Sequence, residues 1–518
     1  MKYFLFYLFL FLLIPKSNSQ ELTLGTTFST VFCNQELYVA GSSRELNVQG
    51  IPLLNQGSLG LGNFTTQVND YQQLNFNFGA PIKKVVSNDY STFVLLQNGD
   101  LWAFGNNSRG NLGTGNQIDQ NSPIRVLGIG GVGFLTNITD VDTSDYRGTT
   151  LAIDNQGRVL QWGNRPYDYD NSNNPPSLML VPEYVINSST QQPLANIIKI
   201  AAGYNVSYAI DSNNNLWYWG ANLYSGTGTS TGEIYEATQT PFINNLNSID
   251  VSNWHSIALK NDGSVWTWGS NSYGEMGVGN SVSNSFFPMQ VLGTNGNGFL
   301  QNITKIVSNG LHSFALRNNN TLWSWGLNND GVLGNSNIAL GSSSFVPIQV
   351  QGFNGNGVLQ NVTDIKTSRK TAVATLNYAC DAVAWGYTKN SITGVGFNNI
   401  TLHPKYMSFH QLSCCGPLAI DSFAEYKADK TTICPGECIE VEAVVASGNP
   451  IVSYWISIGA SSVTNTSTTT VVYSSTNYPN MRPITSIGIP ALPCFNIFNK
   501  AKELITIFSE SSGNLSSF

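Results

Sequence analysis

The stretch SNGLHSFALRNNNTLWSWGLNNDGVLGN, from Ser308 to Asn335, contains the pattern that decides the fold. Within it an apolar segment, HSFAL, is followed by the polar turn RNNN and by a second apolar segment, LWSWG, that ends at Gly326. Asn and Gly suit tight turns because both tolerate positive φ. The two segments are therefore predicted to form an antiparallel hairpin.

This hairpin is one copy of a unit that recurs through most of the chain. Equivalent segments end at Gly41, Gly105, Gly163, Gly220, Gly269, Gly326 and Gly386. Successive glycines are 64, 58, 57, 49, 57 and 60 residues apart, a period typical of one supersecondary unit per repeat. A segment with apolar residues three apart, such as Ile303 and Ile306, precedes the hairpin, and a segment such as VPIQVQG follows it. Four short strands per unit predict the blades of a propeller.

The stretch quoted above and its companion SNWHSIALKNDGSVWTWGSNSYGEMGVGN, Ser252 to Asn280, resemble repeats of the regulator of chromosome condensation family. The resemblance covers roughly Glu21 to Leu412 and implies a seven-bladed propeller, in agreement with the seven glycines. The predicted fold is all-β, with a signal peptide at 1–19, the propeller at 20–412 and a small Cys-containing β-rich region at 413–518. This last region is interpreted as an incomplete immunoglobulin-like module.

The tryptophans of the repeat are predicted to form the core of the blades. Successive residues of a strand point to opposite faces, so LWYWG at Leu216–Gly220 places large side chains on both faces, and neighbouring blades must cover both. The alternative is a platform on which a ligand stacks. The blade-core prediction covers Trp102, Trp162, Trp217, Trp219, Trp266, Trp268, Trp323, Trp325 and Trp385.

The N-terminus and the composition favour a secreted protein. Lys2 precedes an unbroken apolar run from Tyr3 to Ile14, and Ser17 and Ser19 suit a cleavage site, so the mature chain is predicted to begin at Gln20. Twelve apolar residues are too few to span a bilayer as a helix, which disfavours the alternative of a retained anchor. The net charge is −7 and charged residues make up 11% of the chain, which argues against nucleic-acid binding.

The sequons and cysteines of the chain are consistent with secretion. The glycosylation candidates are Asn63, Asn106, Asn137, Asn187, Asn205, Asn302, Asn319, Asn361, Asn399, Asn465 and Asn514, although chance matches are expected in so Asn-rich a chain. The disulfide candidates are Cys33, Cys380, Cys414, Cys415, Cys434, Cys438 and Cys494. Seven is an odd number, so one thiol is free or pairs between chains. A bridge between Cys33 and Cys380 is a hypothesis for the seam between blades 1 and 7, and CPGEC is expected to close a loop rather than to bind zinc.

No catalytic, cofactor or metal site is predicted. His255 and His312 occupy a repeat position that elsewhere holds Ser91, Thr149 and Val206, so a shared acid–base role is disfavoured and a structural polar contact is expected. Alternating oxygen-bearing residues in an irregular loop resemble Ca²⁺ ligands, but the positions of an EF-hand are not matched, so a solvated loop is preferred. Those residues are Asp168, Asp170, Ser172 and Asn174.

Two features concern closure and specificity. FHQLSCCG, with Phe409, Leu412 and Gly416, copies the spacing of a first strand and is expected to close the ring, with ELTLG near Glu21 as the alternative. Specificity is expected where the units disagree, in the segments Arg44 to Ala80, Arg165 to Pro176 and Tyr224 to Thr240.

The predicted function is that of a secreted or cell-surface propeller that binds a protein or glycan partner, without catalysis, without nucleic acid and without stable membrane insertion after signal cleavage. The resemblance also implies an alternative, guanine-nucleotide exchange on a small GTPase, to which no residue of this chain can be matched. A secreted enzyme inhibitor is a third possibility, since a propeller of this kind resembles one that blocks β-lactamases.

Overall fold

The computed structural model describes residues 21–33, 35–43, 57–62, 67–145, 148–165, 178–204, 206–221, 233–376, 382–388, 400–407, 423–428, 432–433, 438–445, 450–460, 468–474, 489–490 and 495–496. The chain divides into two compact units, Met1–Gly416 and Pro417–Phe518. Among the described residues, no helix is long and apolar enough to cross a membrane.

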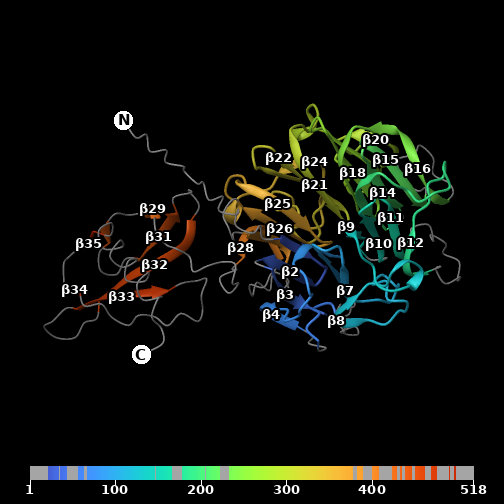
Figure 1. The fold of residues 1–518 in the computed structure, drawn as a ribbon. Helices are drawn as coiled ribbons and strands as arrows, with labels where there is room; N and C mark the ends of the chain where they lie inside the picture. The colour runs from blue at the N-terminus through green and yellow to red at the C-terminus, as the bar shows by residue number, and fades with distance from the viewer. Residues whose placement is uncertain are drawn as a thin grey trace, which may run out of the picture. The chain divides into compact units, whose positions relative to one another are not determined.

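The first unit contains seven four-stranded antiparallel sheets, so the predicted all-β, seven-bladed propeller is confirmed (Figure 1). Blade 1 consists of β1 (Glu21–Leu24), β2 (Phe28–Cys33), β3 (Glu36–Ser42) and β4 (Gln67–Gln73). Blade 2 consists of β5 (Ile82–Ser87), β6 (Ser91–Leu96), β7 (Leu101–Gly105) and β8 (Gln120–Arg125), and blade 3 of β9 (Ile138–Thr143), β10 (Thr149–Asp154), β11 (Val159–Asn164) and β12 (Leu178–Tyr184). Blade 4 consists of β13 (Ile197–Ala202), β14 (Val206–Asp211), β15 (Asn215–Ala221) and β16 (Glu233–Asn244).

The remaining three blades repeat this order. Blade 5 consists of β17 (Leu246–Val251), β18 (His255–Lys260), β19 (Val265–Ser270) and β20 (Asn284–Gln290). Blade 6 consists of β21 (Ile303–Asn309), β22 (His312–Arg317), β23 (Leu322–Leu327) and β24 (Ser343–Gln349), and blade 7 of β25 (Val362–Thr367), β26 (Thr371–Leu376), β27 (Ala382–Tyr387) and β28 (Ile400–Met407). Short 3₁₀ turns, η1 (Ile129–Gly131), η2 (Thr294–Gly296) and η3 (Phe353–Gly355), follow the outer strands of blades 2, 5 and 6.

The first strand of each blade lies innermost. These first strands contact one another in order around the ring, from β1 to β5 and onward to β25, and β25 in turn contacts β1. Each blade consists of four consecutive strands, and Glu21–Leu24 pairs with β2 as the inner strand of blade 1. The structure thus adopts the alternative closing segment at Glu21. The expected closing segment around Phe409 lies outside the described residues.

The hairpins have the predicted register. His312 lies opposite Gly326 in the ladder between β22 and β23, and Ser91 lies opposite Gly105 between β6 and β7. Gly326 has φ of +102°, and a Cβ at this position would lie 2.3 Å from the backbone O of Leu311. Only glycine accommodates both that conformation and that close approach, which explains why glycine recurs at this position of the anchor.

In blades 3 to 7 the tryptophan immediately before the anchor glycine, called the second tryptophan, packs between blades. All five are fully buried: Trp162, Trp219, Trp268, Trp325 and Trp385. Trp268 Nε1 donates to the Tyr208 hydroxyl of the preceding blade at 2.9 Å. Trp325 Nε1 donates to the backbone O of Glu275, also in the preceding blade, at 2.8 Å. Each indole therefore fills the space between two blades and also bonds across it.

The first tryptophan of the anchor is less uniform. Trp323 is buried, whereas Trp102, Trp217 and Trp266 are half-buried. Lys260 Nζ lies 5.2 Å from the centroid of the Trp266 ring, at the outer part of blade 5. These half-buried rings contribute less to the core than the second tryptophans because part of each ring remains in water.

The second unit is also built from strands. Its main sheet has the order β29-β31-β32-β33-β34, and β30 pairs with β35. The bounds are β29 (Phe423–Ala428), β30 (Thr432–Ile433), β31 (Cys438–Val445), β32 (Pro450–Ala460), β33 (Thr468–Ser474), β34 (Ile489–Pro490) and β35 (Phe495–Asn496). The segments between these strands lie outside the described residues, so the immunoglobulin-like module stays a prediction.

Candidate binding face and central channel

Because the strands of each blade are antiparallel, successive connections between strands lie at opposite ends of the propeller. The connections from first to second strand and from third to fourth strand emerge at one end, called the loop face here; residues 88–90 and 106–119 of blade 2 are examples. The hairpin turns and the links between blades emerge at the opposite end, the turn face. The three segments expected to carry specificity all follow a third strand and therefore begin at the loop face.

Those three segments are not loops throughout. Gln67–Gln73, within the segment from Arg44 to Ala80, forms the outer strand β4, and β16 begins at Glu233, within the segment from Tyr224 to Thr240. Most of the segment from Arg165 to Pro176 lies outside the described residues, as do the four residues considered as Ca²⁺ ligands. Among the described residues, no group of three or more His, Cys, Asp or Glu side chains could hold a metal ion.

Charged residues link the inner strands around the central channel. The apolar residues three apart, such as Ile82 and Val85, are buried in the blades. Between and beside them lie charged residues of mostly alternating sign from one blade to the next: Glu21, Lys84, Asp140, Asp142, Lys199, Asp250, Lys305, Asp364 and Lys366. Sequence reasoning missed this set, although the segments IKKVV, ITDVD, IIKIA, ITKIV and VTDIK contain its signal.

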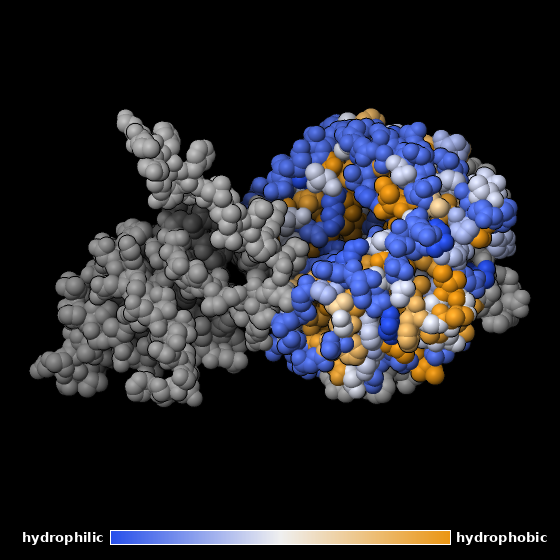
Figure 2. Space-filling model, viewed as in Figure 1, coloured by the Kyte–Doolittle hydropathy of each residue, from blue (hydrophilic) through white to orange (hydrophobic). Residues whose placement is uncertain are grey.

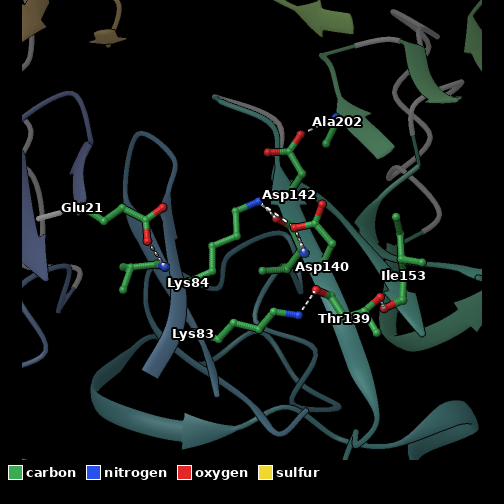
Figure 3. A network of polar contacts seen from close by, with 10 residues as sticks. Glu21, Lys83, Lys84, Thr139, Asp140, Asp142, Ile153 and Ala202 are labelled. Atoms are coloured by element: carbon green, nitrogen blue, oxygen red, sulfur yellow. Dashed lines mark hydrogen bonds and ion pairs between the residues drawn. The ribbon is translucent and has the colours of Figure 1, made fainter. Parts of the chain in front are cut away.

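The lysines of one blade bond to the inner strand of the next (Figure 3). Lys84 Nζ lies 2.7 Å from Asp140 Oδ1 and donates to the backbone O of Val141 at 3.0 Å. Lys83 Nζ donates to the backbone O of Thr139 at 2.7 Å. Burial lowers the pKa of Lys84, but the nearby carboxylates of Asp140 and Asp142 more than offset it, so the pKa is raised.

The carboxylates of one blade accept from backbone N–H groups of the next. Asp142 Oδ2 accepts from the N–H of Ala202 at 2.8 Å, as Figure 3 shows. The equivalent Asp250 Oδ2 accepts from the N–H of Ser308 at 2.5 Å. An inner strand is a sheet edge whose N–H groups lack a neighbouring strand, so these carboxylates supply the missing acceptors.

Burial is the largest influence on the pKa of Asp250 and of Asp142. It raises the pKa of Asp250 to about 6, against the lowering effect of the Ser308 N–H. Burial also raises the pKa of Asp142, although Lys84 and the Ala202 N–H act in the opposite direction. These described charged groups thus bond to the neighbouring blade, either as an ion pair, as in Lys84 with Asp140, or through its backbone N–H groups, as in Asp250 with Ser308.

A polar cluster lies where the loop face meets the channel. Asn309 of blade 6 donates through Nδ2 to Asp145 Oδ2 of blade 3. Arg369 Nη1 of blade 7 lies 4.0 Å from Asp89 Oδ2 of blade 2, and Thr26 of blade 1 donates to Asp89 Oδ1. Burial, and then the neighbouring Asp89, raise the pKa of Asp145 well above its ordinary value. This cluster joins loops of blades that are not neighbours.

His255 and His312 lie in the core. His255 Nδ1 lies 2.7 Å from Ser252 Oγ, and its Nε2 lies 2.7 Å from Ser313 Oγ in blade 6. His312 Nε2 lies 2.8 Å from Thr367 Oγ1 in blade 7. Burial lowers the pKa of both imidazoles to about 3, so they are neutral at physiological pH. Their contacts join neighbouring blades, as a structural polar role requires.

Three of the sequons share one repeat position, immediately before an inner strand. Asn137, Asn302 and Asn361 have φ of 61°, 62° and 61°. The threonine two residues later bonds within its own blade, as Thr304 Oγ1 does to the backbone O of Leu316 at 3.2 Å. Backbone geometry thus accounts for these three matches whether or not glycans are attached. Asn106, Asn187 and Asn319 are also described, and Asn63, Asn205, Asn399, Asn465 and Asn514 lie outside the described residues.

Comparison with known proteins agrees with this geometry. Two models of the regulator of chromosome condensation (RCC1) repeat match the chain, one at residues 98–146, 262–316 and 319–374 and the other at 82–111, 247–275 and 303–332. The Arabidopsis thaliana ultraviolet-B receptor UVR8 is 22% identical over 321 residues, which cover 60% of this chain and 67% of the receptor.

A second relative and a solved structure extend the comparison. A bifunctional serine/threonine-protein kinase/NEDD4-like E3 ubiquitin-protein ligase of Dictyostelium discoideum is 30% identical over 166 residues, 31% of this chain but only 8% of that protein. The crystal structure of Kap60 bound to yeast RCC1 (Prp20) matches with a TM-score of 0.58 at 17% identity, over 76% of this chain and 86% of that chain. The chain therefore carries RCC1 repeats, and the matched residues lie within its seven-bladed propeller.

Proposed function

We propose that this chain is a secreted or cell-surface, non-catalytic module that binds a protein partner through the loop face of its propeller. The observation that carries the proposal is a difference between the strands of the repeat and the connections that follow the third strand. The strands, the anchor glycines and the core tryptophans recur from blade to blade, whereas the third-to-fourth connections differ in length and composition. A rigid ring with variable connections is the arrangement on which binding sites are commonly built.

The loop face also presents apolar and aromatic side chains. Ile118, Tyr273 and Leu340, in the third-to-fourth connections of blades 2, 5 and 6, are 65%, 45% and 48% exposed. In the first-to-second connections of blades 4 and 5, the rings of Tyr204 and Trp254 lie 5.7 Å apart between centroids. Aromatic residues are enriched among the residues that contribute most to protein–protein affinity, so this composition favours a protein partner.

The described titratable groups of the inner strands and of the core support a role without catalysis. The histidines of blades 5 and 6 are buried and neutral, and the described channel carboxylates bond to neighbouring blades. A general acid or base must reach a substrate, and these groups are committed to the fold. A solved structure with the same fold is that of Kap60 bound to yeast RCC1 (Prp20), and this association of an RCC1 protein with another protein supports a protein partner for this chain.

The proposal is tested with the mature chain, tagged at its C-terminus, as bait in conditioned medium, with capture followed by cross-linking mass spectrometry. We expect cross-links to the loop face, and we expect the paired substitution Trp254→Ala and Tyr273→Ala to lower capture at least tenfold. The matched control changes two apolar residues of the turn face, Val132→Ser and Phe299→Ser, which are 81% and 54% exposed. Capture that is lost in the turn-face variant alone would contradict the proposal.

The compartment is tested separately. The tagged full chain is expected in the medium or on the cell surface, with Gln20 as the N-terminal residue, because the leader is predicted to be cleaved after Ser19. Accumulation in the nucleus would instead favour the nucleotide-exchange alternative. Capture by a glycan surface in place of a protein would favour the glycan alternative.

A further inference from the structure

Three sequons share one position of the repeat, next to the channel. Asn137, Asn302 and Asn361 immediately precede β9, β21 and β25, the inner strands of blades 3, 6 and 7. Each therefore lies in a link between two blades, at the end of the propeller where the inner strand begins. All three belong to the turn face and lie beside the channel. Asn137 and Asn302 are exposed, and Asn361 is half-buried.

Backbone hydrogen bonds hold these asparagines in place. In blade 6, the N–H of Asn318 donates to the backbone O of Asn302 at 2.9 Å. The N–H of the next residue, Ile303, donates to the backbone O of Gly263 in the preceding blade at 3.1 Å. The sequon is thus fixed between two hairpin turns through its backbone alone. Because the Asn302 side chain is exposed, a sugar attached to its Nδ2 displaces no packed neighbour.

The fold explains the asparagine of these sequons but not the threonine. Asn196 and Asn245 occupy the same position in blades 4 and 5, each with φ of 60°. Asparagine tolerates this left-handed conformation better than most residues with a side chain, which accounts for its recurrence in five blades. Two residues later, blades 4 and 5 have Ile198 and Asn247, so the inner strand accepts residues other than threonine there. In the other three blades the threonine completes a sequon.

We propose that Asn137, Asn302 and Asn361 carry N-linked glycans and that these glycans keep the protein partner away from the turn face. The inference rests on the secretory route of the proposed function, because these glycans are attached in that route. N-linked glycans are bulky and solubilising. Three of them beside the channel occupy the space that a partner would need to dock on the turn face.

The glycan is transferred from an oligosaccharide that is joined to a lipid through a diphosphate. The asparagine Nδ2 attacks the anomeric carbon of the first sugar, so a C–N bond forms and the C–O bond to the diphosphate breaks. The lipid diphosphate leaves, the nitrogen loses one proton, and nothing is oxidised or reduced. The transfer precedes folding of the blade, because in the folded blade the hydroxyl of the sequon threonine is bonded to the backbone, as Thr304 Oγ1 is to the O of Leu316 at 3.2 Å.

The direct test uses the full chain produced in a eukaryotic host and recovered from the medium. Its peptides are treated with peptide N-glycosidase in water enriched in heavy oxygen, which converts each glycosylated asparagine into a labelled aspartate that mass spectrometry detects. The expected result is label at Asn137, Asn302 and Asn361. A secreted chain that lacks the label at any of the three would overturn the inference and leave the proposed function standing. A chain that accumulates in the nucleus without glycans would overturn both.

A second test uses variants of the sequon threonines. Thr139→Ile, Thr304→Ile and Thr363→Ile copy Ile198 of blade 4, and each is expected to remove one glycan and to increase the mobility of the chain on a denaturing gel. Serine at the same positions is the matched control, because it keeps the sequon, and is expected to leave the mobility as in the parent. An isoleucine variant that migrates like the parent contradicts the glycan at that position.

The role of the glycans is tested by capture of the partner. The triple isoleucine variant is expected to capture the partner within twofold of the parent, because the loop face is unchanged. A tenfold loss of capture would show that the partner recognises the turn face or its glycans, and would refute the shielding role. If the triple variant is not secreted, the parent treated with the glycosidase takes its place.

Discussion

Replacing Trp268 by alanine is expected to lower the free energy of unfolding by about 4–6 kcal/mol. The side chain is fully buried between blades 4 and 5, in a cluster that includes Tyr208 and Ala258. Removing a buried tryptophan costs about 3–5 kcal/mol because the transfer free energy is lost and a cavity remains. The lost bond from Nε1 to the Tyr208 hydroxyl adds on the order of 1 kcal/mol, and that hydroxyl keeps its bond from Ser256 Oγ.

The assay is thermal and urea unfolding followed by far-ultraviolet circular dichroism. For a unit of this size, 1 kcal/mol corresponds to about 1–1.5 °C, so the melting temperature is expected to fall by about 4–9 °C. Trp266→Ala is the matched control on the same strand. Its ring is half-buried, and its Nε1 bonds to Ser264 Oγ of the same hairpin at 3.1 Å, so a cost of at most about 2 kcal/mol is expected. Equal costs for the two variants, or a Trp268→Ala variant that melts like the parent, would refute the placement of the second tryptophan as the inter-blade core.

Further predictions concern pH, buried charge and backbone geometry. The pKa of His255 is about 3 in the folded chain and 6.5 in the unfolded chain, so the unfolded chain binds more protons between these values. The contribution of His255 to stability is therefore present above pH 6.5 and is lost as the pH falls toward 3, by about 3 kcal/mol at pH 4. Urea titrations at pH 7 and pH 4 test this, and His255→Gln is expected to show a smaller loss of stability at pH 4 than the parent. The pKa of Asp250 is raised to about 6, so its pH dependence has the opposite sign: its contribution to stability is present below pH 3.8 and is lost as the pH rises through 6. The change in unfolding free energy caused by Asp250→Asn is therefore expected to be more favourable at pH 7.5 than at pH 3.5, by up to about 3 kcal/mol. An equal change at both pH values would contradict the burial of this charge. Gly326→Ala is expected to lower the free energy of unfolding by at least about 3 kcal/mol, because its Cβ would lie 2.3 Å from a backbone oxygen. The control Gly341→Ala, with φ of +77° and no atom within 4 Å of the added Cβ, is expected to cost about 1 kcal/mol, and similar melting temperatures for the two variants would show that the close approach is unimportant.

The blade and its hairpin were predictable because their interactions are local. The register of His312 opposite Gly326 follows from fourteen residues of continuous sequence and a turn whose residues tolerate positive φ. The seven anchor glycines then give the number of blades. The prediction for the inner strands was incomplete. It identified the buried pair Ile82 and Val85, but not the lysine between them, because the spacing of apolar residues says nothing about partners on another strand.

The interactions between blades needed the assembled ring. Lys84 and Asp140 are 56 residues apart in the chain, and Asp145 bonds to Asn309 across 164 residues. A repeated sequence shows that equivalent residues occupy equivalent places in each blade. It does not show which residues of different blades meet, because that depends on the rotation from one blade to the next.

Local pattern was therefore sufficient for the unit, its register, the number of copies and the need for glycine at Gly326. Assembly decided the rest: that Glu21–Leu24 takes the inner place in blade 1, that the inner edges are covered by carboxylates such as Asp142, and that Cys33 lies in the seam. The physical reason is that hairpins depend on the backbone of neighbouring residues, whereas burial and charge pairing in a closed ring depend on side chains that the chain brings together only after every blade has formed.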